Sequence, residues 1–324
     1  MRILVTGGSG FIGTNLCAYL AQSGDVVLNV DCLTPRNIES IDSWKPLNVC
    51  DIAPLLATFS SFEPDYVVHL AARTDLDGLS LAEYRSNTDG VRSVIEASLS
   101  CTSIKRVIFA SSRLVCKIGY LPSSDSDYCP TTLYGESKVL GENIVRDFAR
   151  DAPWPWCIVR PTSIWGPWFD IPYRQFFDSV VAGRYVHPKG VSISKSFGYV
   201  GNTVYQLAKL LKAPAPLVDR KTLYLADYPP IEVESLANQI RQQLRMDPVS
   251  QVPVALLKLL ARFGDIAKQA GMNNPPLTRF RLANLLTPMV YDLDPLEQIV
   301  GPLPFDMESG VRITLDWILS SSKA

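Results

Sequence analysis

The sequence predicts an α/β fold, with a doubly wound parallel sheet followed by a smaller, mainly helical lobe. Through the first half of the 324 residues, short apolar runs alternate with helical patterns, which is the order of repeated βαβ units. The runs are apolar throughout, as expected when helices cover both faces of a parallel sheet. After about residue 166 prolines become frequent and helical patterns dominate, so we expect the second lobe there.

The predicted elements of the first half follow one another in alternation. Strands are expected at Ile3–Val5, Val26–Val30, Tyr66–Leu70, Val107–Ala110 and Cys157–Val159. Helices are expected between them, at Ile12–Gln22, Ala53–Ser60, Thr88–Ser98 and Leu133–Phe148. Each helix is long enough to connect two parallel strands by a crossover.

Composition narrows the function classes. The chain is 47% hydrophobic and 19% charged, with a formal net charge of −1, which is ordinary for a globular protein. This balance shows no electrostatic footprint for nucleic acid or for an anionic membrane. The N-terminal MRILVTGG leads straight into a strand pattern without the features of a secretory signal, and no apolar run approaches the roughly 20 residues of a membrane span. We therefore expect a cytoplasmic protein with no membrane span.

The metal-binding and thiol residues show no organised pattern. The seven cysteines are scattered without a CxxC pair, and the chain has only two histidines, His69 and His187. We expect free thiols in a reducing compartment and no metal site.

One helical segment of the lobe can be interpreted in two ways. Val254–Ala270 places Lys258, Arg262 and Lys268 around an apolar stripe. Such a pattern is typical either of a lobe helix with a solvated basic face or of a helix that touches a membrane surface or a partner. We interpret the segment as a lobe helix with a solvated basic face.

A glycine-rich loop follows the first predicted strand. Residues 5–13 read VTGGSGFIG, in which Gly8, Gly10 and Gly13 fit GxGxxG, and Gly7, Gly10 and Gly13 fit GxxGxxG. Glycines let the backbone turn tightly and approach a pyrophosphate, while the helix that begins here presents unpaired N–H groups to the anion. A strand before the loop and a helix after it are the context that this motif requires.

An acidic residue at the end of the second predicted strand indicates the dinucleotide. Asp31 can accept hydrogen bonds from an adenosine ribose and would repel a 2′-phosphate, which favours NAD. Arg36 keeps NADP open, because an arginine near the ribose can accommodate that phosphate. We predict a Rossmann NAD-binding domain over residues 1–165 and a substrate-binding lobe over residues 166–324, some strands of which can return to the Rossmann sheet.

A candidate acid–base pair lies on one helix. Residues 134–138 read YGESK, so Tyr134 and Lys138 share one helical face. A phenol with its usual pKa near 10 is a poor catalyst at neutral pH. We expect the Lys138 ammonium group to lower the pKa of Tyr134 and to hold the nicotinamide ribose.

The order of these motifs resembles that of a known family. TGGSGFIG, CDI at 50–52, VVHLAA at 67–72, NTDGV at 87–91, FASS at 109–112, YGESK and RPTSIWGP at 160–167 follow one another with rough family spacing. The chain resembles an extended short-chain dehydrogenase/reductase of the NAD-dependent epimerase/dehydratase family over nearly its whole length. The motif series is specific for the family and much less specific for one activity.

The resemblance implies a set of cofactor contacts. They are Gly7, Gly10, Phe11, Ile12, Gly13, Asp31, Asp51, Ile52, Leu70, Ala71, Ala72, Asn87, Tyr134, Lys138 and Pro161. Within this set Asp31 would bind ribose, Asp51 and Ile52 would flank adenine, and Asn87 would support the backbone of the active site.

The resemblance also implies a catalytic trio of Ser112, Tyr134 and Lys138, in which the Ser112 hydroxyl bonds the reacting oxygen. Nucleotide-sugar 4,6-dehydratases of the family follow this serine or threonine with acidic residues that remove a proton and expel a hydroxyl. Arg113 and Leu114 stand at those positions, and neither side chain can do that work. We therefore disfavour a 4,6-dehydratase.

Two redox reactions remain. The first is nucleotide-sugar epimerisation, in which a sugar carbon is oxidised, the ketone rotates and the carbon is reduced on its other face. The alternative is an NAD(P)H-dependent reductase of a keto-sugar or of another carbonyl compound. A non-catalytic dinucleotide-binding protein is a third possibility, disfavoured because it would not need Ser112, Tyr134 and Lys138 together.

The remaining expectations concern the substrate and the assembly. Arg113, Ser163 and Lys195 are candidate substrate contacts, of which the two cations suit a phosphate or carboxylate. We expect a small-molecule substrate, with a nucleotide sugar favoured, and no nucleic-acid partner. The family pairs the helices predicted at Thr88–Ser98 and Leu133–Phe148 across a two-fold axis, so we also expect a homodimer.

Overall fold

A seven-stranded parallel sheet is the central element of the computed structural model, which describes residues 1–170, 173–269, 271–272 and 277–321. Its spatial order is β11-β6-β5-β4-β1-β2-β3. The strands are β1 (Arg2–Thr6), β2 (Val26–Asp31), β3 (Trp44–Pro46), β4 (Tyr66–His69), β5 (Arg106–Ala110), β6 (Trp156–Pro161) and β11 (Lys221–Leu225). The strand order reverses between β1 and β4, and ligands bind at the carboxyl ends of strands beside such a switch point.

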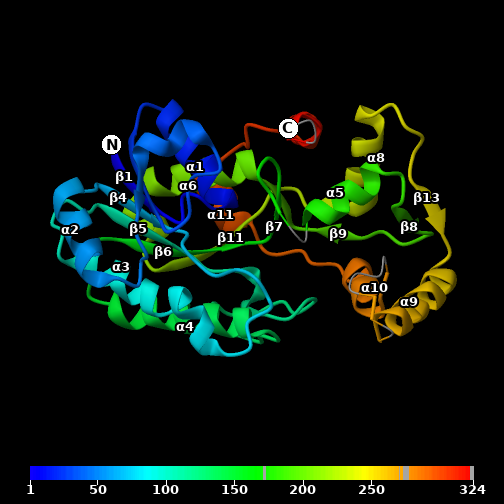
Figure 1. Cartoon of the computed structure of the whole chain (residues 1–324), viewed down its shortest axis with the longest axis horizontal. Helices are drawn as coiled ribbons and strands as arrows, with labels where there is room; N and C mark the ends of the chain where they lie inside the picture. Colours follow the sequence, from blue (N-terminus) through cyan, green and yellow to red (C-terminus); the bar gives the residue numbers. More distant parts are fainter. Residues whose placement is uncertain (171–172, 270, 273–276, 322–324) are drawn as a thin grey trace.

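Helices cover both faces of this sheet (Figure 1). α2 (Ile52–Phe62), α3 (Asp89–Leu99) and α4 (Leu133–Phe148) lie on one face, and α1 (Phe11–Gln22) and α6 (Val200–Lys212) on the other. Successive residues of β1 supply the two cores: Leu4 packs in the cluster that holds Leu55, whereas Ile3 and Val5 pack in the cluster that holds Leu16. Both faces of the strand are therefore buried, which explains its unbroken apolar run.

The predicted fold class is confirmed, and each predicted strand and helix of the first half is present within one or two residues. Two strands of the sheet were not located in the sequence. β3 is only three residues long, and β11 follows the lobe's first elements before pairing with β6. The return of β11 agrees with the expectation that later strands can rejoin the Rossmann sheet.

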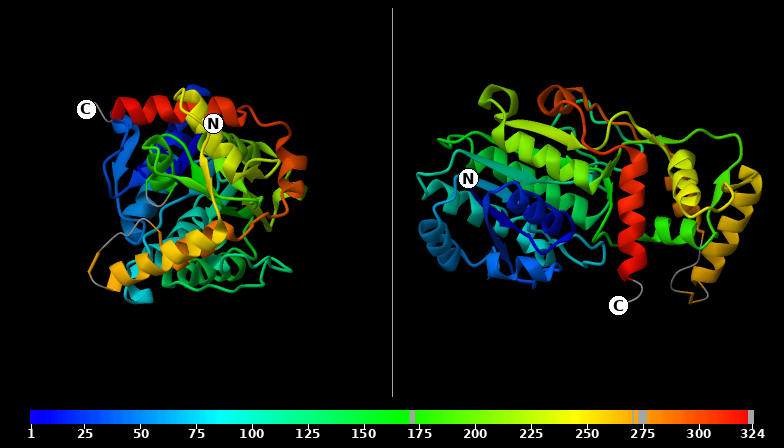
Figure 2. Two further views of the ribbon diagram at one scale, coloured as in Figure 1. Left: turned by 90° about the vertical axis from the view of Figure 1, so that its right-hand side faces the viewer. Right: turned by 90° about the horizontal axis from the view of Figure 1, so that it is seen from above.

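The remaining elements build the lobe and the connections near the site. They are the 3-10 segments η1 (Ile38–Ser43), η2 (Leu81–Asn87) and η3 (Arg113–Val115), the strands β7 (Ser163–Trp165), β8 (Val186–Pro188), β9 (Ser194–Lys195), β10 (Phe197–Tyr199), β12 (Ile231–Glu232) and β13 (Ser250–Val252), and the helices α5 (Tyr173–Val181), α7 (Ala215–Val218), α8 (Val233–Gln243), α9 (Val254–Gln269), α10 (Arg279–Leu286), α11 (Asp294–Val300) and α12 (Met307–Ser321). α9 and α10 form the end of the molecule farthest from α2 (Figures 1 and 2). Of the helices that the structure describes, none is both long and apolar enough to cross a bilayer.

The outward side of α9 carries both the expected cations and apolar side chains that were not expected there. Leu257 and Ala261 face inward and pack with Leu282 of α10. Lys258 and Arg262 are exposed, as expected of a solvated basic face, but an apolar row beside them, which includes Leu259 and Phe263, is exposed as well. The sequence pattern showed an apolar stripe and a few cations, but it did not indicate that part of the apolar stripe also faces solvent.

Candidate active site

The glycine loop is folded tightly between β1 and α1. Gly7 has a φ of +75°, and a Cβ atom built on it would lie 2.5 Å from the Ala71 backbone nitrogen. A Cβ atom on Gly13 would lie 2.2 Å from the Gly7 carbonyl oxygen. Only glycine fits either position, because backbone atoms occupy the space a side chain needs. The loop thus offers a side-chain-free cradle at the N-terminus of α1, and this cradle fits the pyrophosphate of a dinucleotide.

Asp31 lies beside this loop at the end of β2. Its carboxylate accepts hydrogen bonds from the backbone nitrogens of Ser9 (3.0 Å) and Leu33 (2.9 Å). Arg36 is directed elsewhere: its Nη1 donates to the Trp168 carbonyl oxygen at 2.8 Å, and its Nη2 lies 4.0 Å from Asp170. The Arg36 guanidinium group thus contacts residues 168–170 in this structure and makes no contact with Asp31 among the interactions of the described residues.

The other predicted cofactor residues follow the carboxyl ends of neighbouring strands. Leu70 continues β4, and its backbone nitrogen donates to the Thr6 carbonyl oxygen at 2.9 Å. Phe11 and Ile12 begin α1, Ala71 and Ala72 follow Leu70, Asp51 precedes α2, Ile52 begins α2, and Pro161 ends β6. The structure therefore places this set along one edge of the sheet, around the switch point between β1 and β4.

The structure brings Ser112 and Tyr134 together, although they are far apart in the sequence. Ser112 caps η3, where its hydroxyl accepts from the Leu114 backbone nitrogen at 3.1 Å. Burial raises the pKa of the Tyr134 phenol to about 12, while a hydrogen bond with Ser112 and the positive charge of Arg113 act to lower it. The expected lowering of this pKa by Lys138 is not seen, because burial dominates and the ammonium group is directed to another atom.

Two glycines allow the start of α4 to approach this serine. Thr132 caps the helix, its hydroxyl accepting from the Gly135 backbone nitrogen at 3.0 Å. A Cβ atom on Gly135 would lie 2.3 Å from the Leu114 carbonyl oxygen, and one on Gly141 would lie 2.7 Å from that of Asn87. The absence of side chains at these two positions therefore lets α4 pack directly on η3 and η2.

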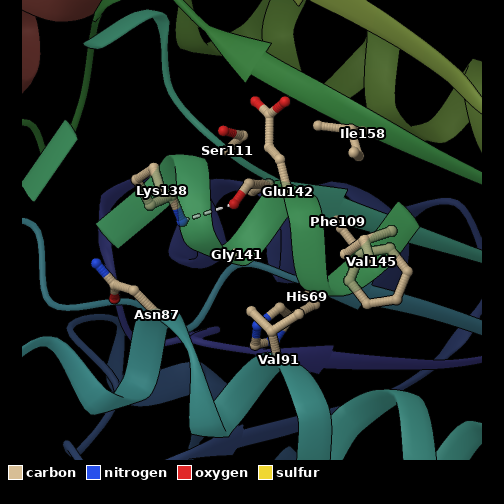
Figure 3. Close-up of a pocket in the computed structure, with 11 residues that line it drawn as sticks. His69, Asn87, Val91, Phe109, Ser111, Lys138, Gly141, Glu142, Val145 and Ile158 are labelled. Atoms are coloured by element: carbon tan, nitrogen blue, oxygen red, sulfur yellow. Dashed lines mark hydrogen bonds between the residues drawn. The ribbon is translucent and has the colours of Figure 1, made fainter. Parts of the chain in front are cut away.

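Lys138 is buried one helical turn after Tyr134. Its Nζ donates to the Ala110 carbonyl oxygen at 2.7 Å, at the end of β5. Burial lowers the pKa of Lys138 to about 8, and the negative charge of Glu142 acts to raise it. Figure 3 shows Lys138, Asn87 and His69 around a small cavity between the sheet and the helices α3 and α4. Burial and the charge of Lys138 together lower the pKa of His69 to about 3, so His69 is neutral there.

Asn87 links the loop after β4 to α4. Its side chain exchanges hydrogen bonds with the Arg73 backbone, at 2.9 Å and 3.0 Å, and donates to the Ser137 hydroxyl at 2.8 Å. Ser137 in turn donates to the Tyr134 carbonyl oxygen at 2.7 Å. This chain of bonds holds the backbone that carries the phenol.

A buried ion pair lies beneath the same helix. Arg160 donates to both oxygens of Glu142 at 2.8 Å, and Tyr128 donates to the same carboxylate at 2.8 Å. Burial alone would raise the pKa of Glu142, but these partners hold it below its usual value. The sequence analysis did not select Glu142, although its position four residues after Lys138 on one helix face was an available signal.

Arg113 and Lys195 form a pair of buried cations, of which Arg113 lies next to the Tyr134 phenol. Arg113 lies beside the Tyr173 and Tyr291 hydroxyls, which, against the effect of burial, act to raise its pKa, and its Nη1 lies 3.6 Å from the Met289 Sδ. Lys195 donates to the Asn284 carbonyl oxygen at 2.6 Å, and its pKa is lowered to about 8 by burial and by the charge of Arg113.

Within the ranges that the structure describes, neither cation has a carboxylate partner, and the Arg113 Nε is buried without a hydrogen-bond acceptor. Buried charges are normally paired, as Arg160 is with Glu142. The unbalanced pair therefore fits an anionic group of a ligand. Tyr173 and Tyr291, which were not predicted from the sequence, lie beside Arg113, and no local motif marked them.

Ser163, the third predicted substrate contact, lies at the start of β7. It is buried and pairs with Phe197 of β10, two residues after Lys195. The structure thus places Ser163 near the strand that follows Lys195, without a direct contact between their side chains among the hydrogen bonds of the described residues.

The family comparison covers more than half of the chain. The model of the NAD dependent epimerase/dehydratase family matches residues 3–189. A Sinorhizobium fredii protein, "Probable dTDP-glucose 4,6-dehydratase", is 29% identical over 54% of this chain and 56% of its own length. The chain therefore spans little more than half of that relative.

Two other relatives match nearly end to end. An Escherichia coli O157:H7 protein, "N-acetyl-alpha-D-glucosaminyl-diphospho-ditrans,octacis-undecaprenol 4-epimerase", is 25% identical over 98% of this chain and 95% of its own. A Stenotrophomonas maltophilia "2-alkyl-3-oxoalkanoate reductase" is 25% identical over 96% and 98%, respectively. The fold agrees with that of the Bacillus cereus UDP-glucuronic acid 4-epimerase solved with UDP-glucuronic acid and NAD, with a TM-score of 0.73, 17% identity and coverage of 99% and 100%.

Proposed function

This chain belongs to the NAD-dependent epimerase/dehydratase family, and from that premise we propose that it is an epimerase acting on a sugar linked to a diphosphate. The observation that carries the proposal is the position of Tyr134. The phenol lies beside Ser112 and Arg113, and Arg113 in turn lies near a second buried cation, Lys195; neither cation has a carboxylate partner in the described parts of the chain. Epimerisation by oxidation and reduction needs one side chain that transfers a proton and a site that binds the anionic part of the substrate. It does not need a second acidic side chain.

We assign the chemical roles from this geometry. Bound NAD would supply the acceptor for the hydride that leaves the sugar carbon and would later return it. Tyr134 would accept the hydroxyl proton as a phenolate when the carbon becomes a ketone and would give the proton back on reduction, while the Ser112 hydroxyl bonds the same oxygen. Because burial raises the pKa of Tyr134 to about 12, this role requires the loaded site to lower that pKa, in the direction in which Ser112 and Arg113 already act. Lys138, with its pKa lowered to about 8 by burial, still carries a proton at neutral pH; its ammonium group is directed to the Ala110 carbonyl oxygen, and its proposed role is to hold the nicotinamide ribose.

Arg113 and Lys195 are proposed to hold the diphosphate. The B. cereus epimerase is solved with a UDP-linked sugar, and the E. coli relative's name gives a sugar on a polyprenol diphosphate. The two substrates share the diphosphate, which is the group that two buried cations would bind. Ser163 remains a proposed sugar contact on the same side.

The strongest competing function is reduction of a keto-sugar or another carbonyl, as in the S. maltophilia relative's name. A 4,6-dehydratase stays disfavoured, because the dehydratase's extra acid would have to come from Arg113 or Leu114. A non-catalytic dinucleotide-binding protein is disfavoured, because it would gain nothing from burying Tyr134 and Lys138 together.

The test is an assay with NAD and a panel of UDP-hexoses, read by chromatography of the products. An epimerase interconverts two sugars without net change in NAD, whereas a reductase consumes NADH in proportion to product. Arg113→Met should raise the KM for the sugar by about tenfold or more and leave NAD binding unchanged. An unchanged KM would contradict the assignment of the cation pair.

We also propose a homodimer through the outer faces of α3 and α4, and a cytoplasmic location. Leu99, Leu140 and Phe148 are exposed on these faces, and Arg92 covers the Phe148 ring at 4.4 Å. Sedimentation of the purified protein at micromolar concentration should give a dimer, and a monomer would contradict the first proposal.

A further inference from the structure

The outward face of α9 is apolar although it points to solvent. Leu256, Leu259, Leu260, Phe263 and Ile266 lie on one side of the helix and are between 46% and 60% exposed. They are spaced by one or three residues, so they form a continuous stripe. We call these five side chains the α9 face.

The α9 face is a second apolar surface on a helix that already has a buried one. Leu257 and Ala261 pack against Leu282 of α10, and a Cβ atom on Gly264 would lie 1.7 Å from the Leu277 carbonyl oxygen. The inner side of α9 is therefore fully used in holding the α9–α10 pair together. A helix that presents a second, exposed apolar face opposite a buried one normally has that second face covered by protein or by lipid.

Residues near α9 extend the apolar surface. Phe280 of α10 is 70% exposed and Met272, between the two helices, is also exposed. Both lie in the segment that forms the tip of the lobe, at the end of the molecule opposite α2 (Figure 2). Because these residues lie at one end of the molecule, they can contact a flat surface without steric clashes between that surface and the rest of the chain.

The charge of this segment points to one kind of partner. Residues 254–286 contain five basic residues and a single acid, Asp265, in a chain whose net charge is −1. Asp265 is paired with Arg279. Lys258 and Arg262, four residues apart, are exposed along one edge of the α9 face. The net charge of the whole chain gave no indication of an anionic membrane, because acidic residues elsewhere in the chain offset the excess of basic residues in this segment.

We propose that the α9 face and Phe280 insert into the headgroup region of a lipid bilayer that contains anionic lipids. The apolar stripe would lie at the boundary with the acyl chains, and Lys258 and Arg262 would reach the lipid phosphates. A second copy of this chain fits less well, because pairing two such faces would bring two basic segments together.

A bilayer bound to the α9 face would lie near the proposed substrate contacts Arg113 and Lys195. The carbonyl oxygen of Asn284, on α10, accepts from Lys195, and Met289 contacts Arg113. A docked α9–α10 pair would thus present the cation pair to a diphosphate sugar carried on a membrane lipid. That consequence rests on the proposed function, whereas the docking itself does not.

Flotation of the full-length protein with vesicles tests the docking without any assay of activity. We expect binding to vesicles of phosphatidylglycerol and phosphatidylethanolamine, and weaker binding to phosphatidylcholine alone. The variant Leu259→Gln/Phe263→Gln/Ile266→Gln should lower partitioning by about tenfold or more. The control Ile38→Gln/Leu79→Gln/Leu319→Gln changes residues elsewhere that are at least as exposed and should bind as the wild type does.

A second variant guards against misfolding of the first. Lys258→Gln/Arg262→Gln keeps the apolar face and should lower binding to the anionic vesicles by about tenfold, with little change on phosphatidylcholine. Absence of wild-type binding to either vesicle would overturn the proposal, as would equal binding by all variants. A vesicle-independent dimer that the α9 variant dissociates would also overturn it and would identify a second copy as the occupant.

Discussion

Two helices of equal length, α4 and α9, each with 16 residues, distribute polarity in opposite ways. α4 turns Tyr134, Lys138 and Glu142 inward, where all three are buried, and leaves polar residues such as Glu136 in solvent. α9 buries Leu257 and turns the apolar α9 face outward. The buried polar groups on α4 are those expected of a catalytic site inside the protein. The exposed apolar groups on α9 are those expected of a surface that binds a partner or a membrane.

The difference has an energetic basis. A buried ionisable group is tolerated only where partners compensate for lost hydration, as Arg160 does for Glu142. An exposed apolar stripe costs little in the isolated chain but gives free energy when another apolar phase covers it. Substitutions on the inner side of each helix should therefore affect the free energy of unfolding, and those on the outer side of α9 should not.

The largest effect is expected at the ion pair beneath α4. Glu142→Gln leaves the Arg160 guanidinium buried without its counter-charge, which should lower the free energy of unfolding by about 3–5 kcal/mol. Urea denaturation measures this change. Glu136→Gln, an exposed change on the same helix, should stay within about 0.5 kcal/mol. Similar results for both variants would contradict the contrast between the inner and outer sides of α4.

A slightly smaller effect is expected on the inner side of α9. Leu257→Ala removes a buried side chain from the contact with Leu282 and should cost about 3 kcal/mol in the same measurement. Leu259→Ala, on the outer side two residues later, should cost less than about 1 kcal/mol. If the two substitutions cost the same, the α9 face is packed against the protein and is not a free surface.

The third expectation concerns activity and separates the two helices functionally. Tyr134→Phe removes the phenolic proton and should lower turnover by about 10²-fold or more, equivalent to about 2.7 kcal/mol. NAD binding and vesicle binding should not change, because the ring and the α9 face both remain. Tyr19→Phe on α1 is the control. Near-normal turnover of the Tyr134 variant would refute the catalytic assignment.

The sequence located the cofactor half of the molecule well because its signals are local. The apolar runs around β1, β4 and β5 extend over only a few residues each. The glycine loop covers residues 5–13, and YGESK covers residues 134–138. Backbone freedom at Gly7 and the helical spacing of Tyr134 and Lys138 depend on near neighbours. Such features can be predicted before any tertiary contact is known.

The tertiary structure decided which groups meet. Arg113 and Lys195 come from distant segments and form a cation pair only because β9 and η3 converge, and Glu142 reaches Arg160 only through the packing of α4 on β6. The outward direction of the α9 face likewise depends on which side α10 covers. The sequence by itself determined the Rossmann sheet and the cofactor loop, because short-range periodicity and glycine conformation specify them. Only the tertiary structure determined the anion pocket and the apolar tip, because burial and electrostatic balance depend on residues far apart in the chain.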